Sequence, residues 1–123
     1  MLKTSSDSAV AKLPAHDIMI QELRHISESM AKKYEEIEEI ILFGSLARGD
    51  YGTDSDADIL VIISSSLYDR FFDRIPKYAP DFLEFCMPVD VFPYTRKEID
   101  IMKGKESLFI RSMLDECIVL SKK

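Results

Sequence analysis

The chain contains two short apolar runs joined by a loop that holds three of its four glycines, and this arrangement constrains the fold more than any other feature. The runs cover residues 40–43 and 59–63, and the loop reads GSLARGDYGTDSDAD. Continuous β-branched and aromatic runs of this length are typical of strands buried on both faces of a sheet. We therefore expect two buried strands and, at the start of the loop, a short helix that Ser45 caps and Gly49 ends.

Amphipathic patterns predict helices before and after this pair of strands. Apolar residues recur at steps of three and four from Pro14 to Ile37, which predicts the first helix. The later elements are expected in this order: a helix over residues 67–77, a strand over 89–94, a helix that begins with Thr95 in a capping box, a helix over 106–116 beyond Gly104, and a strand over 117–121. Helices that alternate with strands predict an α/β or α+β domain.

Length and composition favour one folded domain. The chain has 123 residues, of which 46% are hydrophobic and 31% charged, a composition that supports an ordinary core and lies far from that of disordered chains. The stretch 1–13 is rich in Ser, Lys and Asp and has no sustained period, so we expect a flexible N-terminus there. A single domain is expected over residues 14–123.

Charge and cysteine content bound the compartment and the classes of partner. Lys and Arg number 16 against 22 Asp and Glu, and the net charge of -6 argues against an extended surface for nucleic-acid phosphates. No apolar run is long enough for a signal peptide or a membrane span, and the two cysteines form no C-x-x-C pair. These features predict a cytoplasmic protein that does not enter a membrane.

Gly44 and Ser45 directly follow the first predicted strand. A helix that begins at Ser45 leaves backbone N–H groups unpaired at its N-terminus, and Gly44 lets a phosphate approach the backbone closely. A strand-to-helix turn without any ligand fits the same two residues, and for so short a motif this is the more common case. Gly44 and Ser45 therefore indicate a phosphate site only in combination with other residues.

Three aspartates stand at the beginning of a predicted strand or inside one. Asp56 and Asp58 lie two residues apart, a spacing that places side chains on the same face of a strand, and Asp90 lies within the apolar run PVDVFPY. A charge inside an apolar strand is costly unless it is paired or binds a metal ion. If the two strands are neighbours, the three carboxylates converge and suit one or two Mg²⁺ ions, an arrangement that serves phosphoryl or nucleotidyl transfer. An Asp-rich turn without function is the competing interpretation.

The spaced combination of Gly44-Ser45, ten residues, Asp56-Ala57-Asp58 and a later Asp90 resembles the minimal nucleotidyltransferases (MNT) of the DNA polymerase beta superfamily. The resemblance covers about residues 18–121. It implies the nucleotidyltransferase fold, a small mixed β-sheet flanked by helices, with ATP as donor and release of pyrophosphate. It also implies that the glycine and the serine hold the triphosphate, that Asp56 and Asp58 bind Mg²⁺, and that Asp90 is a third ligand or the base for the acceptor hydroxyl.

Several neighbouring residues allow two interpretations. Arg48 either faces the nucleotide and offsets phosphate charge or is an exposed helix residue paired with Asp50. Asp54 forms a second D-x-D pair with Asp56, although the start of the strand favours the later pair. The two histidines, His16 and His25, have no third metal ligand nearby and are expected at the surface.

The resemblance extends to the partner, because MNT proteins are similar to the antitoxin half of HEPN/MNT toxin–antitoxin pairs, in which AMP is transferred onto a tyrosine of the HEPN ribonuclease. The acceptor surface is expected on another chain, since 123 residues leave no room for an acceptor domain. Eight of the twelve aromatic residues lie between positions 68 and 94, and any excess exposed together is expected to contact a partner. The alternatives are a non-catalytic module that neutralises its partner by binding and a small-molecule, aminoglycoside-like nucleotidyltransferase with an acceptor site built across a homo-oligomer.

Overall fold

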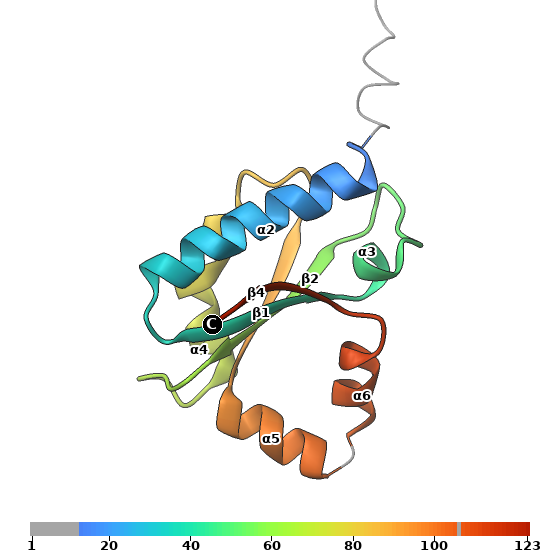
Figure 1. Ribbon diagram of the computed structural model, residues 1–123. Coiled ribbons are helices and arrows are strands. Elements are labelled where there is room, and N and C mark those ends of the chain that lie inside the picture. The colour runs from blue at the N-terminus through green and yellow to red at the C-terminus, as the bar shows by residue number, and fades with distance from the viewer. Residues whose placement is uncertain (1–12, 106) are drawn as a thin grey trace, which may run out of the picture.

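The computed structural model describes residues 13–105 and 107–123 and shows a four-stranded mixed sheet with helices on both faces (Figure 1). The strands are β1 (Ile37–Phe43), β2 (Ala57–Ile63), β3 (Val89–Thr95) and β4 (Ile118–Lys122). Their order across the sheet is β3-β2-β1-β4, with β1 antiparallel to both of its neighbours and β2 parallel to β3. The expected α/β (α+β) class with a small mixed sheet is thereby confirmed.

The helices divide between the two faces of the sheet. They are α2 (His16–Lys33), α3 (Ser45–Arg48), α4 (Phe71–Tyr78), the 3₁₀ helix η1 (Ala79–Phe82), α5 (Arg96–Gly104) and α6 (Leu108–Leu114). Figure 1 shows α2 above the sheet and α5 and α6 below it. No helix of the described ranges is long and apolar enough to cross a membrane.

Side-chain alternation along the strands builds two cores, one on each face. Ile40 and Leu42 of β1 pack on the α2 side, whereas Ile41 and Phe43 pack with α5 and α6 on the other side. Because helices cover both faces of the sheet, residues 40–43 of β1 and 59–63 of β2 are apolar at successive positions, and this explains their continuous apolar runs.

Some predicted boundaries are wrong, and the first helix shows why. Its apolar steps of three and four run on to Ile37, but the helix ends at Lys33 and Tyr34 adopts an extended conformation with φ -112° and ψ 106°. Ile37 is already the first residue of β1, so its helical spacing from the preceding apolar residues is a coincidence. The helix expected from residue 67 begins at Phe71 and includes Pro76.

The last elements are close to expectation. The helix predicted over 106–116 spans only α6, and the strand predicted over 117–121 is displaced by one residue. The capping box is present as predicted, with Thr95 at the N-cap and Glu98 at the third position. Residues 1–12 of the expected N-terminal segment, and Glu106, lie outside the described residues.

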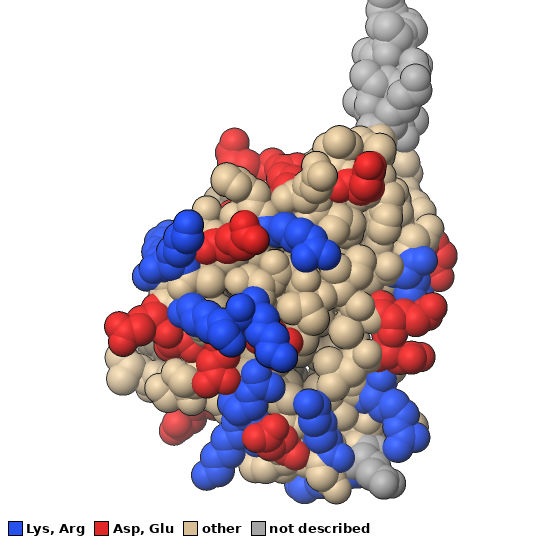
Figure 2. Space-filling model, viewed as in Figure 1, with Lys and Arg blue, Asp and Glu red and all other residues tan. Residues whose placement is uncertain are grey.

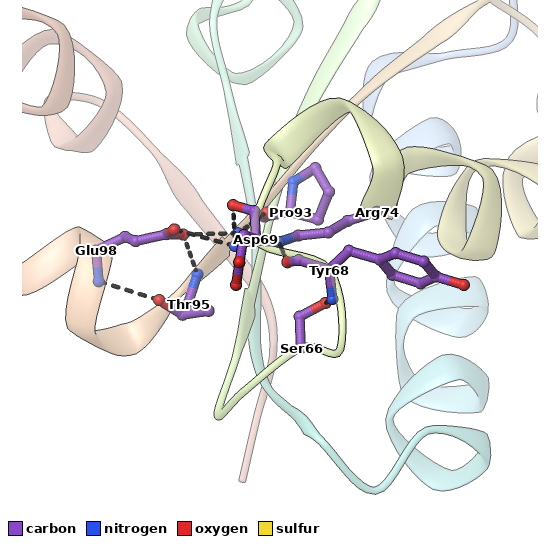
Figure 3. Close-up of polar contacts among 7 residues, drawn as sticks. All are labelled: Ser66, Tyr68, Asp69, Arg74, Pro93, Thr95 and Glu98. Atoms are coloured by element: carbon purple, nitrogen blue, oxygen red, sulfur yellow. Dashed lines mark hydrogen bonds and ion pairs between the residues drawn. The ribbon is translucent and has the colours of Figure 1, made fainter.

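A buried arginine ties α4 to the end of β3 and to the beginning of α5. Arg74 is 3% exposed, and its guanidinium forms two hydrogen bonds with the carboxylate of Glu98, at 2.6 and 3.0 Å (Figure 3). It also donates to three backbone carbonyl oxygens, those of Tyr68, Asp69 and Pro93. Glu98 in turn accepts from the backbone N–H of Thr95. A single side chain thus connects the loop before α4, the end of β3 and the first turn of α5.

Ser27 offers a test of how the α2 side of the core is packed. Its side chain is 0% exposed, and its hydroxyl has no hydrogen-bond partner within the described residues. Ser27→Ala removes an unsatisfied polar group and adds a better helix former, so we expect a gain of about 0.5–1.5 kcal/mol in the free energy of unfolding. The exposed Ser29 of the same helix is the matched control, because Ser29→Ala changes helix propensity alone. Urea unfolding of the two variants measures the difference, and equal values would contradict the account.

Candidate active site

The parallel pairing of β2 with β3 places Asp58 directly beside Asp90. The two residues are register partners, and Asp58 also faces Phe43 across the antiparallel pair of β1 and β2. Their side chains lie on the α5 and α6 side of the sheet, because the next residues of the same parity, Leu60 and Phe92, belong to the core on that side. The adjacency that the sequence analysis required of these two acids is present.

The carboxylate of Asp58 lies in an unfavourable electrostatic environment. Burial raises its pKa above the ordinary value, and the nearby carboxylates of Asp90 and Asp56 raise it further. Asp56 itself is exposed and immediately precedes β2. Asp90 and Asp56 therefore both lie near enough to Asp58 to disfavour its charge, which is the electrostatic condition that a bound cation relieves.

Gly44 brings the turn after β1 against this acid. Its φ is +80°, in the left-handed region that disfavours side chains, and a Cβ atom on it would collide with Oδ2 of Asp58. The N-cap of α3 is Gly44, so the predicted capping by Ser45 is wrong, and Ser45 is the first residue of the helix. Leu46 anchors that short helix in the core. The turn at Gly44 and the Asp58 carboxylate of β2 thus meet, as the sequence motif predicted.

Gly44→Ala is expected to destabilise the protein by about 1–3 kcal/mol, because the left-handed backbone is strained for alanine and the methyl group displaces the Asp58 carboxylate. Any activity that depends on this carboxylate should fall with it. The control is Gly52→Ala, since Gly52 has open space around its Cα and lies in the same loop region. Thermal and urea unfolding compare the two variants, and a Gly44→Ala protein as stable as the control would refute the steric argument.

Arg48 is exposed and paired with Asp50, which is one of the two interpretations that the sequence allowed. Its Nε pairs with Oδ2 of Asp50 at 3.2 Å, and both side chains are exposed. Its charge nevertheless lowers the pKa of Asp58, so it also acts on the acidic cluster. Asp54, the candidate for an earlier D-x-D pair, is an exposed turn residue two positions before the exposed Asp56.

His16 is a residue whose role the sequence analysis missed. Instead of lying free at the surface, it is half-buried, and its Nε2–H donates to the carbonyl oxygen of Leu46 at 2.7 Å. Its ring stacks on Tyr51 with centroids 5.5 Å apart. The first residue of α2 thereby holds both α3 and the loop that leads to Asp56. Contacts over 30 and more positions leave no local signal in a sequence.

The carboxylate oxygens at this site suit a hard cation, although the described residues hold no preformed metal site. Among residues 13–105 and 107–123, no three His, Cys, Asp or Glu side chains are already grouped as a metal site requires. Asp58 and Asp90 nevertheless present carboxylate oxygens side by side on one face of the sheet, with Asp56 near enough to raise the pKa of Asp58. Oxygen donors of this kind are those that Mg²⁺ takes in proteins, usually together with water and substrate phosphates.

Charge on the visible surface is mixed. Figure 2 shows Lys and Arg gathered around α5 in the lower half of the molecule, with acidic side chains between them. Arg96 of α5, for example, pairs with Glu38 and Glu39 of β1.

Comparisons with known proteins agree with this geometry. None of the curated proteins matches the chain significantly. A solved structure from Sulfolobus solfataricus, assigned as a nucleotidyltransferase, is 26% identical with a TM-score of 0.63 and covers 88% of this chain and 84% of its own. A chain from a toxin–antitoxin structure with AMP-PNP shares the fold at 17% identity and a TM-score of 0.54, covering 81% of this chain and 73% of its own. The family model described as "Nucleotidyltransferase domain" matches residues 23–120, and with the turn at Gly44 lying against Asp58 of β2, the chain belongs to that family.

Proposed function

We propose that this protein is a Mg²⁺-dependent nucleotidyltransferase that moves AMP from ATP to a hydroxyl group, the hydroxyl of a tyrosine in a HEPN-type ribonuclease. The observation that carries the proposal is the meeting of Asp58, Asp90 and Gly44 at one end of the sheet. A glycine in the turn lets phosphate oxygens approach the backbone closely, and the nearby carboxylates supply the charge for the cation that accompanies a triphosphate.

Each residue has a role in the proposed reaction. Asp56, Asp58 and Asp90 hold Mg²⁺, which when bound neutralises phosphate charge and polarises the α-phosphorus. Gly44 and Ser45 hold the triphosphate, and Arg48 offsets part of its charge. The acceptor oxygen forms a bond to the α-phosphorus, the bond from that phosphorus to the β-phosphate oxygen breaks, and pyrophosphate leaves. The proton of the acceptor hydroxyl passes to the carboxylate of Asp90.

The partner is proposed from the resemblance to toxin–antitoxin proteins. One structural neighbour belongs to a toxin–antitoxin structure with AMP-PNP, an ATP analogue. We therefore propose an antitoxin role, in which this chain silences its partner by modifying it.

The test is a labelling experiment with α-³²P ATP, Mg²⁺ and the HEPN-type protein that co-purifies with this chain. We expect label on that protein, lost when its acceptor tyrosine is changed to Phe and lost with Asp56→Asn. Absence of label with intact protein, or equal label with Asp56→Asn, would defeat the proposal. EDTA should stop the reaction and added Mg²⁺ should restore it.

The same reagents separate the other two functions. A chain carrying Asp56→Asn and Asp58→Asn that still neutralises its partner fully would identify a binding module in which catalysis has no part. Label found on a low-mass acceptor such as kanamycin, and not on protein, would identify a small-molecule modifying enzyme.

A further inference from the structure

Aromatic side chains from four different elements form a continuous row beside the acidic cluster. Phe92 of β3 lies at its centre, with its ring centroid 5.3 Å from that of Phe43 and 6.4 Å from that of Phe109 on α6. Phe71 of α4 lies 6.1 Å from Phe92, and Phe72 lies 5.0 Å from Phe71. We call these five phenylalanines the aromatic row.

The aromatic row lies next to the acidic residues on the sheet. Phe92 follows Asp90 by two residues, so the two side chains lie on the same face of β3. Phe43 is the register partner of Asp58 on the other side of β2. Beyond Asp90, the face of β3 continues with the rings of Phe92 and Tyr94 rather than with cations or further acids.

Exposure increases along the row, from the acids outward. Phe43 is 9% exposed, whereas Phe109 is 45% and Phe72 is 68% exposed. Leu108, next to Phe109 on α6, is exposed as well. Aromatic surface left open to water at this scale is typical of an interface, because rings contribute large contact area at little cost in side-chain entropy.

The chemistry of the row selects among acceptors. A cationic amino sugar or a nucleic acid would bind through charged groups, and those lie at Asp56, Asp58 and Arg48, whereas the groups that continue from Asp90 along β3 are rings. Rings favour an apolar protein segment that carries an aromatic hydroxyl. Resting on the proposed function, we propose that the aromatic row is the surface on which the acceptor protein docks, so that its tyrosine reaches Asp90.

The exposed rings permit a direct test in the full-length protein. Phe72→Ser and Phe109→Ser, singly and together, remove the outer rings and leave Phe43 and the acids in place. We expect the double variant to bind the co-purifying partner at least about 30-fold more weakly, the scale of losing an interface hot spot. The matched control is Leu83→Ser, which removes an apolar side chain that is 79% exposed and lies outside the row.

Partner affinity is measured by calorimetry without nucleotide, and AMP-PNP affinity is measured separately with Mg²⁺. The proposal predicts a loss of partner affinity for the row variants, wild-type partner affinity for the control, and unchanged AMP-PNP affinity throughout. Weaker AMP-PNP binding with unchanged partner affinity would assign the rings to the nucleobase and overturn the proposal. Unchanged partner affinity in both single variants and in the double variant would also overturn it, and the single variants decide if the double variant does not fold.

The binding test of the docking surface and the labelling test of the reaction can fail independently of each other. If the wild-type chain binds its partner through the row but transfers no label, the proposed function fails and the docking surface remains. If label is transferred equally well by the row variants at low partner concentration, the reaction stands and the docking surface fails.

Discussion

Asp58→Asn is expected to abolish nucleotidyl transfer and, at the same time, to raise the melting temperature of the protein. The variant loses a carboxylate proposed to bind Mg²⁺, so turnover should fall by at least about 10²–10³-fold, the scale of losing one electrostatic stabiliser of a transition state. The two effects have opposite signs because the same charge that serves the reaction destabilises the folded chain.

The gain in stability follows from the raised pKa of Asp58. A carboxyl group with a higher pKa in the folded state binds its proton more tightly there than in the unfolded chain, so its ionised form destabilises the fold at neutral pH. Asparagine keeps the shape and removes the charge. The variant should therefore melt above the wild type near pH 7, and the difference should shrink as acid protonates Asp58 in the wild type.

Differential scanning calorimetry across pH and the labelling assay measure both effects. Saturating Mg²⁺ should raise the melting temperature of the wild type more than that of the variant, because the ion binds the folded wild-type site. Asp54→Asn is the control, since Asp54 is exposed and lies off the sheet. If Asp54→Asn is inactive and Asp58→Asn is active, the metal ligands are the earlier D-x-D pair, Asp54 and Asp56.

Arg74→Met is expected to cost about 3–5 kcal/mol of unfolding free energy, the scale of breaking a buried ion pair by removing one partner. The carboxylate of Glu98 loses its main partner, and three backbone carbonyl oxygens lose a donor (Figure 3). Lysine at this position should rescue little, because an ammonium group cannot reproduce the planar fork of the guanidinium. Urea unfolding measures the loss.

The control for this prediction is Arg70→Met in the preceding turn. Arg70 pairs with Asp73 at 3.8 Å, and both side chains are exposed, so the cost should stay below about 1 kcal/mol. Acidification gives a second measurement. The pKa of Glu98 lies below its usual 4.5 mainly because of the Arg74 guanidinium, so the pair stabilises the fold above that pH and is lost as the pH falls further. Arg74→Met should reduce the dependence of the unfolding free energy on pH in this range. An unchanged dependence would contradict the assignment.

The features that could be predicted from sequence are those with local causes. Continuous apolar runs predicted strands covered on both faces, and the capping box of Thr95 and Glu98 predicted the start of α5 because its two hydrogen bonds span three residues. The positions of Asp58 and Asp90 within apolar runs also drew attention to them, because an unpaired charge is costly there.

Features with distant causes could not be predicted. Nothing local fixes β2 parallel to β3 in the register that sets Asp58 beside Asp90, so from the sequence this pairing could only be assumed. Arg74 appears as one of many charged residues in a helix, although its carboxylate partner lies 24 positions away. The same holds for His16, whose contact with α3 joins residues 30 positions apart.

The place of β4 at the edge of the sheet has a consequence for biosynthesis. β4 pairs with β1 and is formed by residues 118–122, so the open side of β1 has to wait until those residues have left the ribosome. During that interval a strand of seven mainly apolar residues presents unpaired backbone groups on one side, which is a template for association with other nascent chains. Slow synthesis of the segment between β1 and β4 would lengthen this exposure and lower the yield of folded protein.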